Sequence, residues 1–149
     1  MVTAAHPPAP KLQYAALPWR KTARGLEFLL ITTRTTRRWI VPKGWPLKNL
    51  TPAECVAYEA LEEAGVIGTV ARRALGTFIY DKRQKSGKLV PCRVRVFPME
   101  VVTQRRKWVE RDVRKLRWCT CAEEIVLLSD AGLQRLVAKF ARLAESTRH

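Results

Sequence analysis

The sequence predicts a mixed α/β domain, because segments with the alternation of β-strands are interleaved with two helical regions, one mid-chain and one C-terminal. The predicted strands are residues 13–20, 26–32, 39–41, 66–80, 89–102 and 116–119. The chain has 149 residues, and 47% of them are hydrophobic, which suffices for one domain with its own core. We therefore expect a single domain over residues 13–149, preceded by a flexible leader of residues 1–12.

The mid-chain helix has clear start and stop signals. Thr51 suits the N-cap, Pro52 stands at the first helical position, and Glu54 completes a capping box. Gly65 is the type of residue that follows a helix C-terminus in the left-handed conformation. These signals predict a helix over residues 52–64.

Two helices are also predicted near the C-terminus. Thr120 and Glu123 repeat the capping box and predict a short helix. In the final helix, apolar residues recur at a spacing typical of a face packed on a core, and they are Leu133, Leu136, Val137, Phe140 and Leu143.

The connections between the predicted strands are polar and contain glycine. Gly68 and Gly76 are potential breaks or bulges in the strand predicted over 66–80. Residues 81–88 form a basic turn, and residues 104–113 form a charged loop.

The charge of the chain indicates an anionic partner. Twenty-eight Lys and Arg against thirteen Asp and Glu give a net charge of +15, which is usual for proteins that bind phosphates or nucleic acid. A basic surface that serves only solubility is the alternative.

The sequence shows no targeting or membrane signal. Its apolar stretches are far shorter than a membrane span, and residues 1–10 lack a charged segment followed by an apolar one. We expect a cytoplasmic protein with no membrane contact, and the sequence does not indicate an oligomeric state. The four cysteines lack the spacing of a zinc site, so we expect reduced thiols.

Three glutamates form the strongest chemical signal. At about 100° per residue, Glu59, Glu62 and Glu63 fall within one arc of the helix and are expected to face outward, opposite an arc of mostly alanines. Like charges at this spacing weaken a helix by a few tenths of a kcal/mol per pair. A hard divalent cation would offset the repulsion, since oxygen ligands suit magnesium or manganese. A solvated helix face paired with Arg and Lys is the alternative.

The stretch from Gly44 to Val66 resembles the Nudix box, in which a glycine and a loop precede a helix with Arg-Glu-x-x-Glu-Glu-x-Gly and an aliphatic residue. The three glutamates and Gly65 stand in register with it. The Pro42-Lys43-Gly44 entry resembles the branch that acts on diadenosine polyphosphates and diphosphoinositol polyphosphates. The resemblance implies a Nudix-like α/β/α sandwich with a mixed central sheet, a box helix and a C-terminal helix. It also implies hydrolysis of a diphosphate linkage.

The resemblance also implies roles for individual residues. Glu59, Glu62 and Glu63 match the metal-binding glutamates, and the carbonyl group of Gly44 matches one that often completes the metal shell. We expect Mg²⁺, with Mn²⁺ as the alternative. Catalytic candidates are Glu59, Glu62 and Glu110, of which Glu110 is the candidate general base from a later loop. Glu110 as a surface residue paired with Arg111 or Arg106 is the alternative.

Two positions depart from the box. The family usually has a glutamate where Leu50 stands and an arginine where Tyr58 stands. That arginine is normally described as orienting the catalytic glutamate. Either the role is vacant here, or Tyr58 fills it by hydrogen bonding.

Basic residues are candidates for binding the substrate phosphates. Lys43 borders the metal loop, and Arg20 ends the first strand near the expected cleft. Arg93 and Arg95 alternate with valines, so both project from one sheet face. If the valines face the core, these two arginines are merely solvated.

We expect a highly phosphorylated small-molecule substrate, either a dinucleoside polyphosphate or a diphosphoinositol polyphosphate, and the sequence does not choose between them. One alternative is an RNA 5′-end pyrophosphohydrolase, in which Trp45 or Trp108 would stack on the first base, although Trp45 also suits a packing anchor. Another is a non-catalytic Nudix scaffold that binds nucleic acid. The charge and the substitutions at positions 50 and 58 favour this scaffold, whereas the three glutamates count against it.

Overall fold

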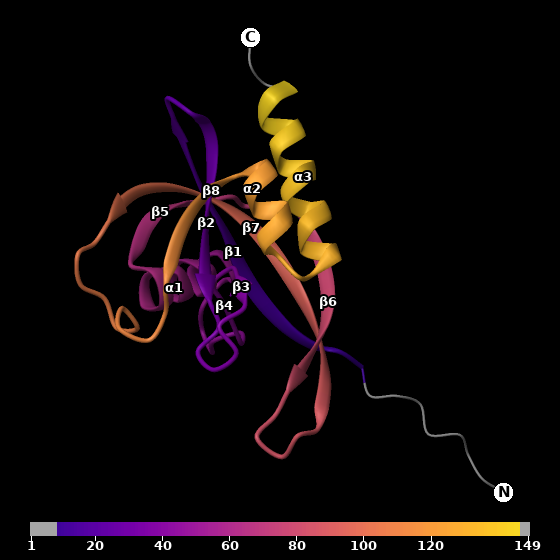
Figure 1. The fold of residues 1–149 in the computed structure, drawn as a ribbon. Coiled ribbons are helices and arrows are strands. Elements are labelled where there is room, and N and C mark those ends of the chain that lie inside the picture. The colour runs from indigo at the N-terminus through magenta and orange to yellow at the C-terminus, as the bar shows by residue number, and fades with distance from the viewer. Residues whose placement is uncertain (1–8, 147–149) are drawn as a thin grey trace, which may run out of the picture.

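The structure, a computed structural model, describes residues 9–146, in which helices cover both faces of a central β-sheet (Figure 1). The strands are β1 (Lys11–Thr22), β2 (Gly25–Thr32), β3 (Trp39–Ile40), β4 (Lys43–Gly44), β5 (Val66–Val70), β6 (Gly76–Arg83), β7 (Leu89–Gln104) and β8 (Leu116–Thr120). The helices are α1 (Pro52–Ala64), α2 (Cys121–Leu127) and α3 (Ala131–Ser146). This mixed α+β arrangement of three layers confirms the predicted fold class. Residues 1–8 of the expected leader lie outside the described part, and β1 begins at Lys11.

The sheet is mixed and is organised around β1 and β7. These two strands pair in parallel, and β1 also pairs antiparallel with β2 and β4. Strands β3 and β8 extend the sheet from β2. Tyr14 on β1 lies opposite Gly44 on β4 and opposite Arg95 on β7, so these three residues form one row across the sheet.

The long strand predicted over residues 66–80 is two strands. Strand β5 pairs with the second half of β7, and β6 pairs with the first half, so the two short strands lie end to end along the same edge of β7. Hydrogen bonds from the amides of Ala71 and Leu75 to β7 span the break. The register also shifts between Ile67 and Gly68, which confirms a bulge there.

Helices α2 and α3 cover one face of the sheet. Leu133, Leu136 and Val137 on α3 pack on a cluster that includes Leu17 and Phe28. Burying each such side chain contributes about 1.5–3 kcal/mol. The apolar stripe predicted for the last helix therefore packs on the core through Leu133, Leu136, Val137 and Phe140, whereas Leu143 is 49% exposed.

Helix α1 covers the opposite face. Its buried residues Val56, Ala60 and Ala64 pack on a second cluster that includes Leu29 and Phe97. Because two of the three contacts are alanines, the helix backbone lies close to the sheet. This close packing fixes the glutamates of α1 relative to the strand ends around β4.

The predicted helix ends are confirmed. Thr51 and Glu54 form both hydrogen bonds of the capping box, and Thr120 and Glu123 do the same for α2. Gly65 ends α1 in the left-handed conformation with φ 68°. Within residues 9–146, none of the helices has both the length and the apolar character needed to cross a membrane.

Candidate active site

Glu59 lies directly against Gly44. A β-carbon at position 44 would come 2.4 Å from Cδ of Glu59, so a larger residue there would force the carboxyl group to move. Pairing with β1 holds Gly44, and packing of α1 on the sheet holds Glu59. The fold therefore places a carboxylate beside the backbone of Gly44, which is where the box resemblance puts a metal ion.

Glu63 is buried, and the expectation that all three glutamates face outward is wrong for this residue. Its side chain is 6% exposed. Oε1 accepts a hydrogen bond from the backbone amide of Lys43 at 3.1 Å, and Oε2 lies 3.4 Å from Nη2 of Arg114. The reason is the helix phase, since the face that carries Glu63 turns toward β4 and the strand ends rather than toward solvent.

Burial and crowding disfavour the charged forms of these acids. Burial raises the pKa of Glu63 to about 8, although Arg114 opposes the shift, and the nearby Glu59 adds to it. Burial also raises the pKa of Glu59, a hydrogen bond with Glu63 opposes this, and the charges of Glu110 and Glu62 add to it. A cation bound here would stabilise the ionised carboxylates, so metal binding would release protons.

The donors suit a hard divalent cation. In the described part of the chain, no three carboxylate, thiol or imidazole groups converge closely enough to hold a metal ion. Magnesium, however, is commonly held by one or two carboxylates together with waters and substrate phosphates. Glu59 and Glu63 beside Gly44 meet that requirement. Glu62 is half-buried, and its charge acts on Glu59.

The β7–β8 loop brings Glu110 to the same acids. The amide of Glu110 donates to the carbonyl oxygen of Glu62 at 3.0 Å. Its carboxylate accepts from Nε of Arg114 at 2.9 Å and lies 3.9 Å from Nε of Arg34. Its ion pairs are therefore with these two arginines, and neither Arg111 nor Arg106 is a partner.

Of the two tryptophans considered for base stacking, Trp108 is packed against the protein and Trp45 is exposed. Trp108 packs on the end of α1, where a β-carbon on Gly65 would come 2.4 Å from its ring. The indole nitrogen of Trp108 is buried and has no hydrogen-bond partner among the described residues. Trp45 is 41% exposed, so it is not a core packing anchor, and Nζ of Lys82 lies 4.9 Å from its ring centre.

The side chain of Lys43 lines a cavity of about 330 Å³, whose lining residues do not include the acids of α1. Its Nζ lies 4.9 Å from the ring centre of Tyr80, and burial lowers the pKa of Lys43 to about 8, with Glu63 opposing the shift. The cavity is lined by aromatic and apolar side chains, including Trp39 and Phe78, and by two carboxylates, Asp81 and Asp130.

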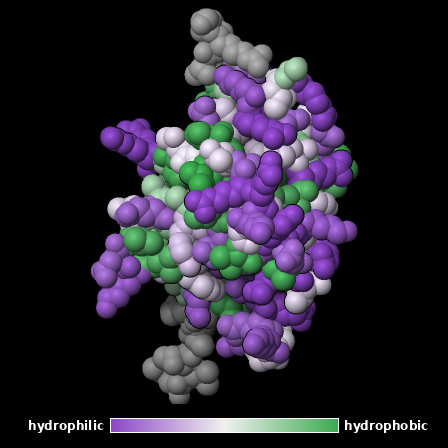
Figure 2. Space-filling view, turned by 90° about the vertical axis from the view of Figure 1, so that its left-hand side faces the viewer, coloured by the Kyte–Doolittle hydropathy of each residue, from purple (hydrophilic) through white to green (hydrophobic). Residues whose placement is uncertain are grey.

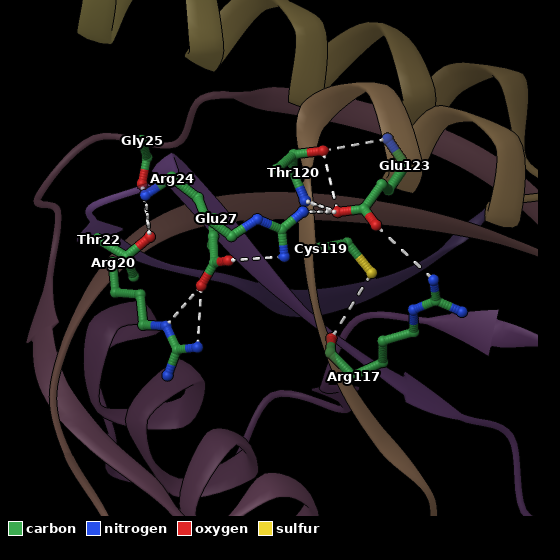
Figure 3. A network of polar contacts seen from close by, with 9 residues as sticks. All are labelled: Arg20, Thr22, Arg24, Gly25, Glu27, Arg117, Cys119, Thr120 and Glu123. Atoms are coloured by element: carbon green, nitrogen blue, oxygen red, sulfur yellow. Dashed lines mark hydrogen bonds and ion pairs between the residues drawn. The ribbon is translucent and has the colours of Figure 1, made fainter.

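Arg20 is occupied by other partners. It forms an ion pair with Glu27 at 2.9 Å (Figure 3). Its guanidinium also lies 3.9 Å from the ring centre of Trp118. Neither partner is one of the site acids, so a role of Arg20 in substrate binding stays a prediction.

Arg93 and Arg95 project from the sheet face opposite their neighbouring valines, which are buried in the core under α3. Arg93 is exposed, as expected for a solvated residue. Arg95 lies over Phe97, 5.5 Å from the ring centre, and is in the same row as Gly44. With neighbouring strands about 4.8 Å apart, the backbones of Arg95 and Gly44 are about 10 Å apart.

The two positions that depart from the box are both at the surface. Tyr58 is 46% exposed, and Leu50 is 39% exposed. Within residues 9–146, Tyr58 has no side-chain hydrogen bond to a site acid. Hydrogen bonding by Tyr58 therefore does not replace the arginine of the motif.

Sequence reasoning missed Arg114 and Tyr80. Arg114 is 9% exposed and contacts Glu63 and Glu110, and Tyr80 donates a hydrogen bond to Gln13 beside the Lys43 cavity. Tyr80 directly precedes the basic turn, and an aromatic residue at that place was the signal that could have identified it. Arg114 stands among several arginines and has no local signal.

The surface around the β7–β8 loop is strongly basic. Four exposed cations follow β7, and they are Arg105, Arg106, Lys107 and Arg111. Figure 2 shows this side of the molecule, where hydrophilic residues dominate and hydrophobic ones occur in small separate groups. A group of exposed cations therefore lies on the loop that carries Glu110.

Comparison with known proteins agrees with this geometry. A family model described as the NUDIX domain matches residues 12–140. The mitochondrial Nudix hydrolase 12 of Arabidopsis thaliana is 31% identical over 83% of this chain and 62% of its own length. Nudix hydrolase 13 of the same plant is 29% identical over 79% and 61%. The chain thus spans about three fifths of the length of the curated relatives it matches.

Solved structures share the fold. An Ap4A hydrolase from C. elegans superposes with a TM-score of 0.69 at 19% identity, covering 91% of this chain and 98% of the other. The NUDIX domain of Shewanella oneidensis NrtR, complexed with ADP ribose, gives 0.68 at 17% identity over 91% and 90%. These solved structures show that the α/β/α arrangement of this chain is a known fold. The chain belongs to the Nudix family.

Proposed function

We propose that the protein is a divalent-metal-dependent pyrophosphohydrolase that cleaves a diphosphate linkage in a dinucleoside polyphosphate. The observation with the most weight is that Glu59 lies against Gly44 while Glu63 accepts a hydrogen bond from the backbone amide of the adjacent Lys43. Membership of the Nudix family supports hydrolysis of this kind of bond.

The metal ion would be held by Glu59, Glu63 and the carbonyl group of Gly44, with Glu62 close by. Magnesium is proposed, with manganese as a substitute, because all donors are hard oxygens. When bound, the ion would polarise phosphate oxygens and lower the pKa of a coordinated water.

The residues of this chain then have separate roles. Glu110 would accept the proton of the attacking water, since its carboxylate is 21% exposed and is held beside the helix acids. Lys43 would bind phosphate oxygens next to the scissile bond. Arg95 lies in the same row of the sheet as Gly44 and is a second candidate for binding phosphate oxygens. Attack on phosphorus would break the anhydride bond and leave two phosphorylated products.

The Lys43 cavity favours a nucleotide over an inositol polyphosphate. Its volume of about 330 Å³ is within the range of small-ligand sites, and the rings of Trp39, Phe78 and Tyr80 give it flat apolar walls. Such walls suit a neutral, planar base. The cavity is also lined by two cations, Arg38 and Lys43, and two carboxylates, Asp81 and Asp130, so its charge is balanced and does not match a densely phosphorylated ring.

The RNA 5′-end activity and the non-catalytic nucleic-acid scaffold have weaker support. Trp108 is packed on Gly65, and Trp45 is an exposed single ring with Nζ of Lys82 4.9 Å from its centre, so the first rests on one aromatic side chain. A scaffold that binds only nucleic acid does not account for the half-buried Glu59 and the buried Glu63 beside residues 43 and 44.

A substrate panel tests the proposal. The purified protein is incubated with Mg²⁺ and equal concentrations of diadenosine tetraphosphate, ADP-ribose, a diphosphoinositol polyphosphate and RNA with a 5′-diphosphate. The proposal expects kcat/KM for diadenosine tetraphosphate to exceed that for the inositol compound by at least tenfold. A preference for the inositol compound or for RNA would overturn the assignment of the substrate.

A further inference from the structure

Arg114 makes three contacts with different parts of the site. Its Nε donates to Glu110 at 2.9 Å, its Nη1 donates to the carbonyl oxygen of Thr32 at 2.9 Å, and its Nη2 lies 3.4 Å from Glu63. Its side chain is only 9% exposed. The guanidinium therefore spans the β7–β8 loop, the end of β2 and helix α1.

The planar guanidinium suits this arrangement. Its N–H groups are fixed in one plane and point in set directions, so two carboxylates and a carbonyl oxygen can be bound at once. A lysine ammonium has no such fork. The backbone on either side adds to the fixation, because the amide of Lys115 donates to the hydroxyl of Thr32 at 2.9 Å.

The loop that carries Glu110 is held in place by contacts with other elements. Residues 105–115 contain no regular secondary structure, and they are joined to α1 by amides of Arg105 and Glu110. These bonds hold the loop backbone at two points, and the Glu110 carboxylate adds further attachment through Arg114 and, at 3.9 Å, through the exposed Arg34. Arg114 is the buried one of these two partners.

We propose that Arg114 is a positioning residue that holds the Glu110 carboxylate at a set place beside the acids of α1, and that it affects turnover through Glu110. Tyr58 does not hold the Glu110 carboxylate in place of Arg114, since it is exposed and makes no side-chain hydrogen bond in the described part of the chain. The proposal rests on the proposed hydrolase function and on Glu110 as the general base.

A double-mutant cycle with diadenosine tetraphosphate and Mg²⁺ tests whether Arg114 acts through Glu110. Arg114→Met should lower kcat by roughly 10²-fold, as Glu110→Gln should, with KM changed less than threefold. The double mutant should be no slower than Glu110→Gln alone, because residues that act as a unit have non-additive effects. Arg114→Lys should fall between wild type and Arg114→Met. Arg111→Met, an exposed arginine of the same loop, is the matched control and should leave kcat within twofold.

A second measurement does not depend on turnover. Hydrogen exchange of the Glu110 amide should become at least tenfold faster in Arg114→Met and stay unchanged in Arg111→Met. If wild type cleaves none of the panel, the proposed function fails, and hydrogen exchange alone decides whether Arg114 fixes the loop.

Three results would overturn the proposal. They are a kcat within threefold of wild type in Arg114→Met, additive losses in the double mutant, or unchanged exchange at Glu110. If Arg114→Met does not fold at the assay temperature, the same cycle is run with Arg114→Lys, for which additivity has the same meaning.

Discussion

Lys43 takes part in both halves of the proposed site. Its backbone amide binds Glu63, and its side chain lines the cavity near Tyr80. A cation in a partly dehydrated cavity interacts more strongly as the local phosphate charge rises, whereas an exposed cation is screened within about 8 to 10 Å at ordinary salt. Lys43→Ala should therefore raise KM more for dinucleoside tetra- and pentaphosphates than for a dinucleoside diphosphate.

The basic turn supplies the control for this measurement. Lys85 is exposed in the β6–β7 turn and belongs to neither the cavity nor the acid cluster. In Lys85→Ala, KM should shift weakly and equally for all substrates, and the shift should vanish at high salt. Equal, salt-sensitive shifts in both variants would mean that Lys43 contributes only general attraction.

Glu63 is the acid whose surroundings respond most to a metal. It is buried between the backbone amide of Lys43 and the guanidinium of Arg114, so solvent cannot take the place of its charge at the metal. Glu63→Gln should weaken Mn²⁺ binding at least tenfold in a calorimetric titration of the free protein at pH 8. Glu100→Gln, an exposed acid on β7, is the control. An unchanged dissociation constant in Glu63→Gln would remove Glu63 from the metal site.

At the scale of elements, helix α2 contains a buried acid without a partner. Glu124 is fully buried, neither carboxyl oxygen has a hydrogen-bond partner in the described residues, and burial raises its pKa to about 9. The unfolded chain ionises this group near its ordinary pKa of 4.5. The folded state therefore loses stability relative to the unfolded state as the pH rises from about 4.5 to about 9.

Replacing this acid by its neutral counterpart should flatten the dependence of stability on pH. At about 1.4 kcal/mol per pH unit, the loss attributable to Glu124 at pH 7 is on the order of 3 kcal/mol. Glu124→Gln should show a smaller decrease in the free energy of unfolding between pH 5 and pH 8 than wild type, measured by urea denaturation. Parallel curves for the two proteins would show that Glu124 does not titrate in this way.

The C-terminal end of α1 joins the box helix to the β7–β8 loop. Gly65 has φ 68°, its carbonyl oxygen accepts from the amide of Arg105, and Trp108 covers its α-carbon. Gly65→Ala adds left-handed strain of about 1–2 kcal/mol and a clash with the indole ring. Thermal unfolding should occur at a lower temperature, and Trp108 should become more accessible to a fluorescence quencher. Gly87→Ala, which has a positive φ in the open β6–β7 turn, controls for the strain alone.

At the scale of the whole molecule, local sequence signals predicted the elements and tertiary pairing decided the rest. Capping boxes at Thr51 and Thr120 are local, and both helix starts are confirmed. The split of residues 66–80 into β5 and β6 depends on which half of β7 each segment meets. No pattern within those residues could show that partner.

The site residues likewise divide into those that local sequence signals could identify and those that only tertiary contacts reveal. The helix glutamates and Gly44 could be found from their spacing, and the structure brings Glu59 to Gly44. Arg114 could not be found, because its partners Glu63 and Thr32 are 51 and 82 positions away in the sequence. Periodicity placed Glu63 on an outward arc, yet the strand ends around β4 enclose that arc and bury it.

The central claim is that acids of α1 beside Gly44 support metal-dependent cleavage of a phosphoanhydride. The most direct measurement is the rate of diadenosine tetraphosphate hydrolysis by wild type and by Glu59→Gln, each with excess Mg²⁺ and with excess EDTA. We expect cleavage by wild type only when Mg²⁺ is present, and a rate at least 10²-fold lower in Glu59→Gln. Equal rates with Mg²⁺ and with EDTA, or full activity of Glu59→Gln, would contradict the account.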